Sequence, residues 1–317
     1  MVSEQQILEA ANEIRRGGLV AFPTETVYGL GANALNAKAV SGIFAMKERP
    51  SFDPLIVHIS RLESIHQLVE EFDERMLRLA EAFWPGPLTM VVPKSNLVPD
   101  IVTAGLRRVG IRMPANDIAL RLIEASAVPV AAPSANKFGK LSPTKASHVK
   151  KQLPDLKYIL DGGNTSVGVE STVVSIENDG FRILRHGAVT ADELRKYLPE
   201  SSEKETQVLK ITAPGMMLSH YSPEKPVYIL GEHPIPKDTS KAAFLTAGGK
   251  VPANYACFEV LSSNFDASEV AVNLFGALHR MEESDCEFIV AEPISETGIG
   301  IAVMDRLRKA AYRHHNL

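Results

Sequence analysis

Apolar residues along the first 200 positions recur at helical and strand-like spacings in turn. A capping box at Ser3 and Gln6 predicts a helix start, which apolar residues at positions 7, 8, 11 and 14 continue. Asn36, and Thr190 with Glu193, predict two further starts, the second opening a helix through position 197; other helices are expected near 73–83, 117–126 and 144–152. Short apolar runs typical of buried strands fall at residues 19–22, 55–59, 89–92, 109–112, 128–131, 171–176 and 181–184. This alternation predicts an α/β sheet covered by helices.

The pattern changes near residue 200. Residues 200–210 are polar and lack periodicity, and turn residues crowd positions 213–223, which is typical of a linker. A second α/β pattern follows, with strands expected at residues 225–230, 242–246, 257–261 and 287–291, and helices after Asp266 and over 299–313. We therefore expect a first domain over residues 1–205, a linker over 206–222 and a small parallel-sheet domain over 223–317.

The composition is that of a globular protein with reduced cysteines. The chain has 317 residues, 45% of them hydrophobic, which is enough for a sizeable core. Its two cysteines are too few for a disulfide scaffold or a four-cysteine zinc site. No apolar run approaches the roughly 18 residues of a membrane span, and the N-terminus lacks the features of a signal peptide. We expect a cytoplasmic protein with no membrane partner.

Charge is distributed unevenly along the chain. The formal net charge of −4 excludes a globally basic nucleic-acid coat. Residues 126–154, however, contain five lysines and no acidic residue, and three arginines lie between positions 107 and 112. Such a stretch is either a solvated face or an anion-binding cleft, and charge alone does not decide between them.

Several familiar catalytic motifs are absent from the sequence. It contains no phosphate-binding G-x-x-x-x-G-K-[ST] loop, no G-x-G-x-x-G fingerprint, no G-x-S-x-G nucleophile elbow and no H-E-x-x-H zinc motif. An enzyme with this sequence would therefore work without a familiar covalent nucleophile or a structural metal.

Three segments of the first domain combine polar side chains with tight backbone. Residues 23–31 follow a buried strand and include two glycines, although an ordinary strand-to-helix turn would look the same. Lys47 and Arg49 suit phosphate oxygens, although two cations at a helix end are also a common C-terminal cap. Residues 132–144 carry small hydroxyl and amide side chains where a helix N-terminus could hold an anion or simply be capped. Taken singly, each segment is weak evidence.

Together these segments resemble the threonylcarbamoyl-AMP synthase family in its two-domain form. The signature pairs Lys47-x-Arg49 with Ser134-x-Asn136. Further matching motifs lie in register at residues 23–30, 55–58, 84–89, 112–114, 170–173, 185–187, 214–216 and 220–221. The resemblance covers about residues 5–222 and implies a YrdC-like twisted mixed sheet with helices, a smaller Rossmann-like α/β C-terminal domain, and a lid-like linker between them.

The resemblance also implies an activity. Members of this family join L-threonine, bicarbonate and ATP into L-threonylcarbamoyl-AMP and release pyrophosphate, with Mg²⁺ accompanying the ATP. A downstream tRNA threonylcarbamoyl transferase complex then modifies adenosine in tRNA. Because threonine's amine can attack CO₂ directly, the reaction needs positioning and charge stabilisation rather than an enzymic nucleophile. Direct tRNA contact by this chain is compatible with that scheme but not required.

Site residues are carried over from the family position by position. The resemblance implies that Lys47 and Arg49 are catalytic and that Arg112 pairs with the carboxylate of threonine. It implies nucleotide contacts at Lys47, Arg49, Asp53, Arg108, Ala132, Ser134, Asn136, Ser142, Arg185, His220 and Tyr221. It implies threonine contacts at Thr26, His58, Arg112 and Ser171. It names no metal ligands.

Two of these positions depart from the family pattern. Asp53 stands where the family often has asparagine, and its carboxylate would repel phosphate unless it pairs with a cation. Arg108 stands where a small polar residue is more usual, and it adds positive charge near the expected path of the nucleotide.

Two rival interpretations remain open at this point. The first is an RNA-binding module that uses a basic, concave sheet surface, although aromatic residues are only 6% and do not interleave with the lysines. The second keeps the fold but transfers a carbamoyl group from carbamoyl phosphate, although relatives with that activity carry zinc-finger cysteine pairs that this chain lacks.

Overall fold

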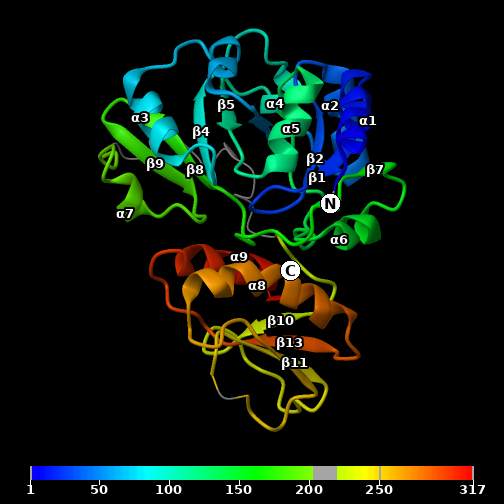
Figure 1. The fold of residues 1–317 in the computed structure, drawn as a ribbon. Coiled ribbons are helices and arrows are strands. Elements are labelled where there is room, and N and C mark those ends of the chain that lie inside the picture. Colours follow the sequence, from blue (N-terminus) through cyan, green and yellow to red (C-terminus); the bar gives the residue numbers. More distant parts are fainter. Residues whose placement is uncertain (1, 203–219, 250, 316–317) are drawn as a thin grey trace.

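The computed structural model describes residues 2–202, 220–249 and 251–315. Within them, the chain forms two α/β units, a larger one with a nine-stranded sheet and a smaller one with a four-stranded sheet (Figure 1). The domain boundaries predicted at residues 205 and 222 stay predictions, and positions 206–219 of the predicted linker lie outside the described residues. Across the described part of the chain, no helix combines the length and the apolar character needed to cross a membrane.

The larger sheet is mixed, as predicted. Its strand order is β7-β1-β2-β6-β3-β5-β4-β8-β9. The pairs β1–β7, β3–β5 and β4–β8 are parallel, and the other neighbouring pairs in this order are antiparallel. The strands are β1 (Val20–Phe22), β2 (Gly29–Asn33), β3 (Ile56–His58), β4 (Leu88–Pro93), β5 (Arg108–Arg112), β6 (Val130–Ala131), β7 (Tyr158–Ile159), β8 (Thr172–Glu177) and β9 (Gly180–Arg185).

Helices cover the two faces of this sheet. They are α1 (Glu4–Arg15), α2 (Ala37–Lys47), the 3₁₀ helix η1 (Leu62–Gln67), α3 (Glu74–Phe83), α4 (Asp100–Thr103), α5 (Asp117–Ser126), α6 (Ala146–Gln152) and α7 (Ala191–Leu194). The predicted caps are confirmed: capping boxes open α1 and α7, and Asn36 caps α2. The helix predicted from Thr190 through position 197 is shorter than expected, since α7 ends at Leu194.

Strand β2 was not predicted from the sequence. Its residues Gly29–Asn33 overlap the end of the segment at residues 23–31, for which a turn was one of the two interpretations. A Cβ atom added at Gly31 would lie 2.7 Å from both the Phe22 ring and a Val130 methyl group, so glycine is required for the chain to pass there. Two glycines in this stretch weaken the strand signal in the sequence. In the structure, they let the backbone approach its neighbouring strands closely enough to pair with them.

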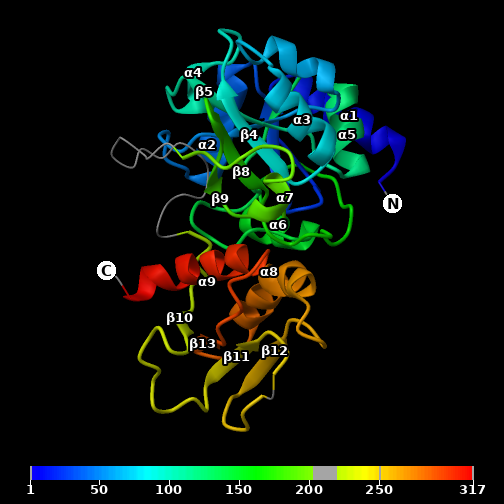
Figure 2. The same cartoon turned by 90° about the vertical axis from the view of Figure 1, so that its left-hand side faces the viewer.

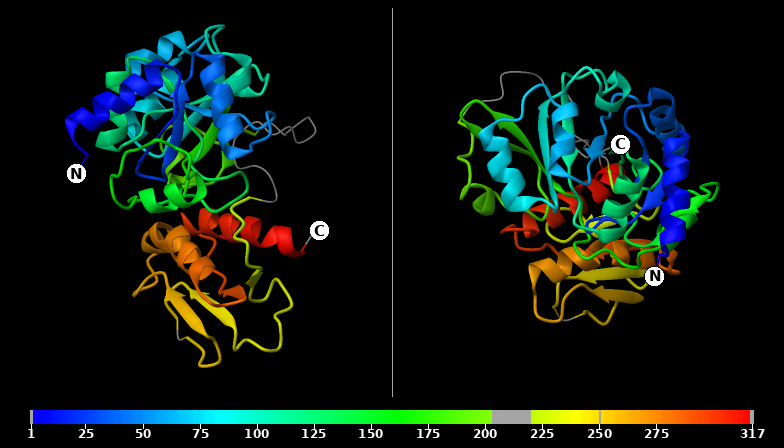
Figure 3. Two further views of the ribbon diagram at one scale, coloured as in Figure 1. Left: turned by 90° about the vertical axis from the view of Figure 1, so that its right-hand side faces the viewer. Right: turned by 45° about the horizontal axis from the view of Figure 1, so that its top comes forward.

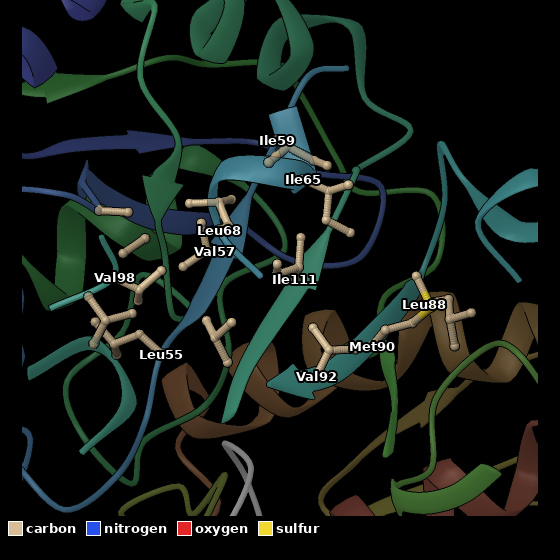
Figure 4. Close-up of a cluster of buried hydrophobic side chains, with 14 of the residues drawn as sticks. Leu55, Val57, Ile59, Ile65, Leu68, Leu88, Met90, Val92, Val98 and Ile111 are labelled. Carbon is tan, nitrogen blue, oxygen red and sulfur yellow. The ribbon is translucent and has the colours of Figure 1, made fainter. Parts of the chain in front are cut away.

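The main core lies between the sheet and the helices of one face. Buried side chains from β3, η1, β4 and β5 meet there, among them Val57, Ile65, Met90 and Ile111 (Figure 4). On the opposite face, α1 and α5 pack against β1 and β6 through a second buried cluster. This burial on both faces explains why the central strands read as short apolar runs rather than as alternating patterns.

The smaller sheet is entirely parallel, as predicted. Its order is β10-β13-β11-β12, from strands β10 (Val227–Ile229), β11 (Ala242–Thr246), β12 (Cys257–Val260) and β13 (Phe288–Ala291). Helices α8 (Ala267–Glu283) and α9 (Gly300–His315) lie between this sheet and the larger domain (Figures 1 and 2). The two domains therefore meet along α8 and α9. The left view of Figure 3 shows these helices from the side opposite to that of Figure 2.

A stacked pair of histidines lies at this contact. His148 of α6 and His279 of α8 have ring centroids 3.7 Å apart, and Nε2 of His279 lies 3.1 Å from the Ser142 carbonyl oxygen. Burial lowers the pKa of His148 to about 3 and that of His279 to about 4. Among the neighbouring charges, Lys145, Lys151 and Arg280 also disfavour protonation of the pair, and Glu283 favours it. Both rings are therefore neutral near pH 7.

We expect this pair to make stability depend on pH. Both folded-state pKa values lie below the ordinary value of 6.5, so stability is complete above pH 6.5 and falls as pH drops below it. Between pH 7.5 and 5.5, the unfolding free energy should fall by about 3 kcal/mol more than in a His148→Gln/His279→Gln variant, at roughly 1.4 kcal/mol per pH unit below 6.5 for each histidine. Urea unfolding at both pH values measures the difference, and equal losses in the two proteins would contradict this prediction.

Candidate functional site

One cavity gathers most of the predicted site residues. It is lined by β3, β5 and β9, by the loops that follow β1 and β6, and by the described end of the predicted linker. Of the predicted residues, it brings together Thr26, Arg49, His58, Arg112, Ala132, Ser134, Ser171, Arg185, His220 and Tyr221. The structure places Lys47, Asp53, Arg108, Asn136 and Ser142 outside its lining. Lining residues that we did not predict are Thr24, Val27, Gly29, Ile56, Pro133 and Glu170.

Arg112 is held at one end of the cavity by three neighbours. It is the last residue of β5, and its Nη2 donates to Oε1 of Glu25 at 2.6 Å. Its Nη1 donates to the Thr26 hydroxyl at 3.0 Å, and its Nε donates to the Gly86 carbonyl at 3.2 Å. A guanidinium has five N–H donors, so this anchoring leaves two for a ligand. Such a preoriented cation suits a carboxylate.

Glu25 was missed because its segment was singled out for its glycines, its place after a strand and its family motif, and the glutamate itself was given no role. Its carboxylate is buried, and it accepts from Arg112 and, at 3.1 Å, from the backbone N–H of Ala115. An acidic residue three positions after a buried strand was the available signal. The structure assigns it the role of fixing the guanidinium of Arg112.

Arg49 and Arg185 supply the other cations of the cavity lining. Nε of Arg185 donates to the Ser171 carbonyl at 3.1 Å, and its Nη2 donates to the Ser171 hydroxyl at 3.1 Å. That hydroxyl lies 2.8 Å from the Thr89 hydroxyl oxygen. Nη2 of Arg49 donates to the Pro54 carbonyl at 2.8 Å. Two buried guanidiniums fixed by backbone carbonyls form a rigid binding surface for anionic oxygens.

Asp53 is buried behind Arg49 rather than in the cavity lining. Its Oδ2 lies 2.9 Å from Nη2 of Arg49, yet neither carboxylate oxygen accepts an aligned hydrogen bond from the described residues, so the attraction is electrostatic. Burial raises the pKa of this carboxyl, while Arg49 and Lys47 act to lower it. The expected repulsion between Asp53 and a phosphate is thus moderated by two adjacent cations.

Three predicted nucleotide residues support the cavity wall from behind. The Lys47 ammonium donates to the Ser134 carbonyl at 2.6 Å and to the Asn136 carbonyl. Burial lowers the pKa of Lys47 well below its ordinary value. The Asn136 amide donates to the carbonyls of residues 137 and 140 at 2.7 and 3.0 Å, and the Ser142 hydroxyl donates to Glu170. These residues shape the loop that carries Ser134 into the cavity.

Arg108 lies elsewhere, at the opposite end of β5 from Arg112. Its Nη2 donates to the Val91 and Ile176 carbonyls at 2.8 and 2.7 Å, and Nη1 lies 3.8 Å from a carboxylate oxygen of Glu177. The two arginines are the first and last residues of this five-residue extended strand, so they lie too far apart to face the same small cavity. In this structure Arg108 ties β4, β5 and β8 together.

Two neutral histidines line the cavity. Burial and the nearby Arg112 lower the pKa of His58 to about 3. Burial, with Arg49 and Lys47, lowers the pKa of His220 well below its ordinary value. Nδ1 of each ring has no hydrogen-bond partner among the described residues. Nδ1 of either neutral ring can therefore donate a hydrogen bond to a ligand or accept one from it, without placing a charge in the cavity.

The described end of the predicted linker forms one wall of the cavity. His220 and Tyr221 are buried, with ring centroids 4.1 Å apart. Tyr221 packs against Phe275 of α8, and the Arg306 guanidinium of α9 lies 5.3 Å from its ring centroid. Residues of the smaller domain thus stand directly behind the cavity wall.

Taken together, the cavity lining offers two sets of binding groups, which we call its Arg112 end and its Arg49–Arg185 end. Arg112 with Thr26 suits a small carboxylate, and Arg49 with Arg185 suits phosphate oxygens. Among the described residues, no group of three or more His, Cys, Asp or Glu side chains is placed to hold a metal ion.

Two protein-family models match the sequence of this chain. A family model described as Telomere recombination (Sua5_yciO_yrdC) matches residues 12–187. A second, described as Threonylcarbamoyl-AMP synthase, C-terminal domain, matches residues 189–312.

Curated relatives and solved structures match over almost the whole chain. The Threonylcarbamoyl-AMP synthase of Pyrococcus abyssi is 45% identical over 98% of this chain and 95% of its own, and that of Bacillus subtilis is 41% identical over 98% and 94%. The crystal structure of P. abyssi Sua5 complexed with L-threonine superposes with a TM-score of 0.87 at 41% identity, covering 98% of this chain and 95% of that one.

Proposed function

The chain belongs to the threonylcarbamoyl-AMP synthase family, and we propose that it joins L-threonine, bicarbonate and ATP into L-threonylcarbamoyl-AMP with release of pyrophosphate. The observation that carries this proposal is that one cavity contains both Arg112, bonded to Thr26, and a second group of cations, Arg49 and Arg185. A single site with a carboxylate end and a phosphate end can hold an amino acid beside a nucleotide.

L-Threonine is assigned to the Arg112 end. The two spare donors of Arg112 bind its carboxylate, and the relative from P. abyssi was crystallised with this amino acid. The neutral His58 ring lies in the same cavity lining and can accept a hydrogen bond from the threonine amine. A neutral ring is needed for this role, because a charged one would repel an ammonium group and could not accept.

ATP is assigned to the end that carries Arg49 and Arg185. Mg²⁺ enters as the complex with ATP, so it is part of the substrate. The threonine nitrogen adds to CO₂ released from bicarbonate and loses a proton, giving a carbamate. A carbamate oxygen then attacks the α-phosphorus, and the bond from that phosphorus to the β-phosphate oxygen breaks, so pyrophosphate leaves. The chain contributes orientation and positive charge, and it forms no covalent intermediate.

This reaction makes the protein a nucleotidyltransferase that serves tRNA processing. The product carries an activated threonylcarbamoyl group, which we assign to a downstream tRNA threonylcarbamoyl transferase complex in the cytoplasm. The RNA-binding alternative is not favoured, because lysines of the basic stretch are paired: Lys137 with Glu48, Lys140 with Glu224 and Lys151 with Glu283.

The test is pyrophosphate release from Mg²⁺–ATP with each co-substrate omitted in turn. We expect release to require both L-threonine and bicarbonate, because the attacking carbamate forms only from the two together. A coupled pyrophosphate assay measures the rate, and mass spectrometry detects the adenylate. Release that is indifferent to threonine would contradict the proposal and indicate another acceptor. No release from folded protein would favour the RNA-binding alternative.

A further inference from the structure

A buried arginine of the smaller domain contacts the wall of the cavity in the larger domain. Arg306 of α9 is 0% exposed, and its Nε donates to Oε2 of Glu170 at 3.0 Å. Nη1 of the same guanidinium donates to Asp305 at 2.8 Å, and the group lies over the Tyr221 ring. Glu170 and Tyr221 both line the cavity, whereas Arg306 itself does not.

Glu170 would place a negative charge beside the phosphates assigned to this cavity. It is an acidic residue in the lining of a site assigned to a polyphosphate, and its side chain is only 7% exposed. Burial acts to raise the pKa of its carboxyl, but Arg306, Arg185 and the Ser142 hydroxyl outweigh burial and leave that pKa lowered. Glu170 is therefore ionised near pH 7, and an unpaired charge at this position would repel the phosphates of ATP.

Two hydrogen bonds from different domains direct this carboxylate. One oxygen accepts from Ser142 of the larger domain, and the other accepts from Arg306 of the smaller domain. Arg185 of β9 also favours the ionised form, while Tyr221 and Asp305 face the Arg306 guanidinium. Neither Glu170 nor Arg306 is among the site residues implied by the family resemblance.

We propose that Arg306 is a positioning residue for the nucleotide site: it neutralises and orients Glu170, so the smaller domain completes the electrostatics of the active site. The inference rests on the proposed function insofar as it names ATP as the ligand. Without the guanidinium, Glu170 would keep a buried charge that repels phosphate, or it would take up a proton as the pH falls. Loss of Arg306 should therefore weaken ATP binding most at high pH.

The experiment compares Mg²⁺–ATP dissociation constants at pH 8 and pH 6 by titration calorimetry. For Arg306→Met we expect a rise of about 10- to 100-fold at pH 8, the range of coupling between contacting charged groups. The ratio to wild type should shrink at pH 6, because loss of the guanidinium raises the pKa of Glu170 from its wild-type value and burial then favours protonation as the pH falls. The double variant Arg306→Met/Glu170→Gln should lie within about threefold of Glu170→Gln alone, at both pH values.

Two further variants separate positioning from a merely structural role. Arg306→Lys keeps the charge and should recover most of the ATP affinity. Arg308→Met removes an arginine of the same helix that pairs with Glu232 and Glu296, away from the cavity, and should leave ATP binding unchanged. If Arg306→Met does not fold, the lysine and double variants still carry the comparison.

Some outcomes would overturn the inference. Wild-type affinity of Arg306→Met at pH 8, or weak binding that Glu170→Gln does not relieve, excludes a role through Glu170. If the wild-type protein binds no ATP, the proposed function fails instead, and thermal unfolding then tests the pair. Arg306→Met should lose more Tm at pH 8 than at pH 6, and Glu170→Gln should remove that difference; a pH-independent loss overturns the inference.

Discussion

Replacing Arg112 with methionine is expected to lower kcat/KM for L-threonine by about 10³-fold and to leave the affinity for ATP nearly unchanged. Of the three arginines in the cavity lining, Arg49 and Arg185 are assigned to the phosphates, so Arg112 is the cation assigned to the threonine carboxylate. Its removal deletes the carboxylate partner and also leaves Glu25 buried without its ion pair at 2.6 Å. Glu25 would then repel the substrate that Arg112 attracts.

The size of this effect follows from the burial of the pair. The side chains of Arg112 and Glu25 are 5% and 8% exposed, so water cannot replace the missing charge. Truncating one partner of a buried, hydrogen-bonded charge pair between binding partners typically costs about 2–5 kcal/mol of binding free energy, and about 4 kcal/mol corresponds to roughly 10³ in kcat/KM.

Steady-state pyrophosphate release at varied threonine concentration provides the measurement. Arg121→Met is a matched control, because Arg121 lies on α5 and pairs with Glu4 and Asp117 at the surface. A loss of less than about tenfold in Arg112→Met would mean that another group binds the threonine carboxylate.

The second large effect is expected on stability, in Arg49→Met. This change leaves Asp53, which is 0% exposed, without the arginine at 2.9 Å, and Lys47 and Arg185 are then the cations left to offset its charge. The unfolding free energy should fall by about 3 kcal/mol. In Arg49→Met/Asp53→Asn most of that stability should return, because the amide carries no charge, while pyrophosphate release stays low because a phosphate partner is still missing.

Urea unfolding at pH 7 and the pyrophosphate assay, run on both variants, separate the two effects. If the double variant is no more stable than Arg49→Met, Asp53 was not the source of the loss. If the double variant regains activity, Arg49 serves the site only by neutralising Asp53.

Local sequence signals identified most elements of the fold. The capping boxes at Ser3 and Thr190 begin helices α1 and α7, and the strand predicted at residues 242–246 coincides with β11 (Ala242–Thr246). These features depend on neighbours within a few positions along the chain, so the sequence contains the whole signal. Strand β7 (Tyr158–Ile159) was missed, because two residues form it only by pairing with β1.

The candidate site was only partly legible from the sequence. The family resemblance drew attention to residues that now share one cavity, among them Arg49, Arg112 and Arg185. It could not show that Lys47 is directed at backbone carbonyls or that Arg108 points away from the cavity. A motif records residue types and spacing, whereas the direction of a side chain depends on what packs around it.

By itself, the sequence determined the α/β class, the parallel character of the second sheet and the family, because periodicity, caps and motifs are properties of the linear chain. Only the tertiary structure decided which charges meet. The pairs Arg112–Glu25 and Arg306–Glu170 join residues 87 and 136 positions apart. Their electrostatic effect depends on distance in space and on burial, and neither quantity can be read from positions so far apart in the chain.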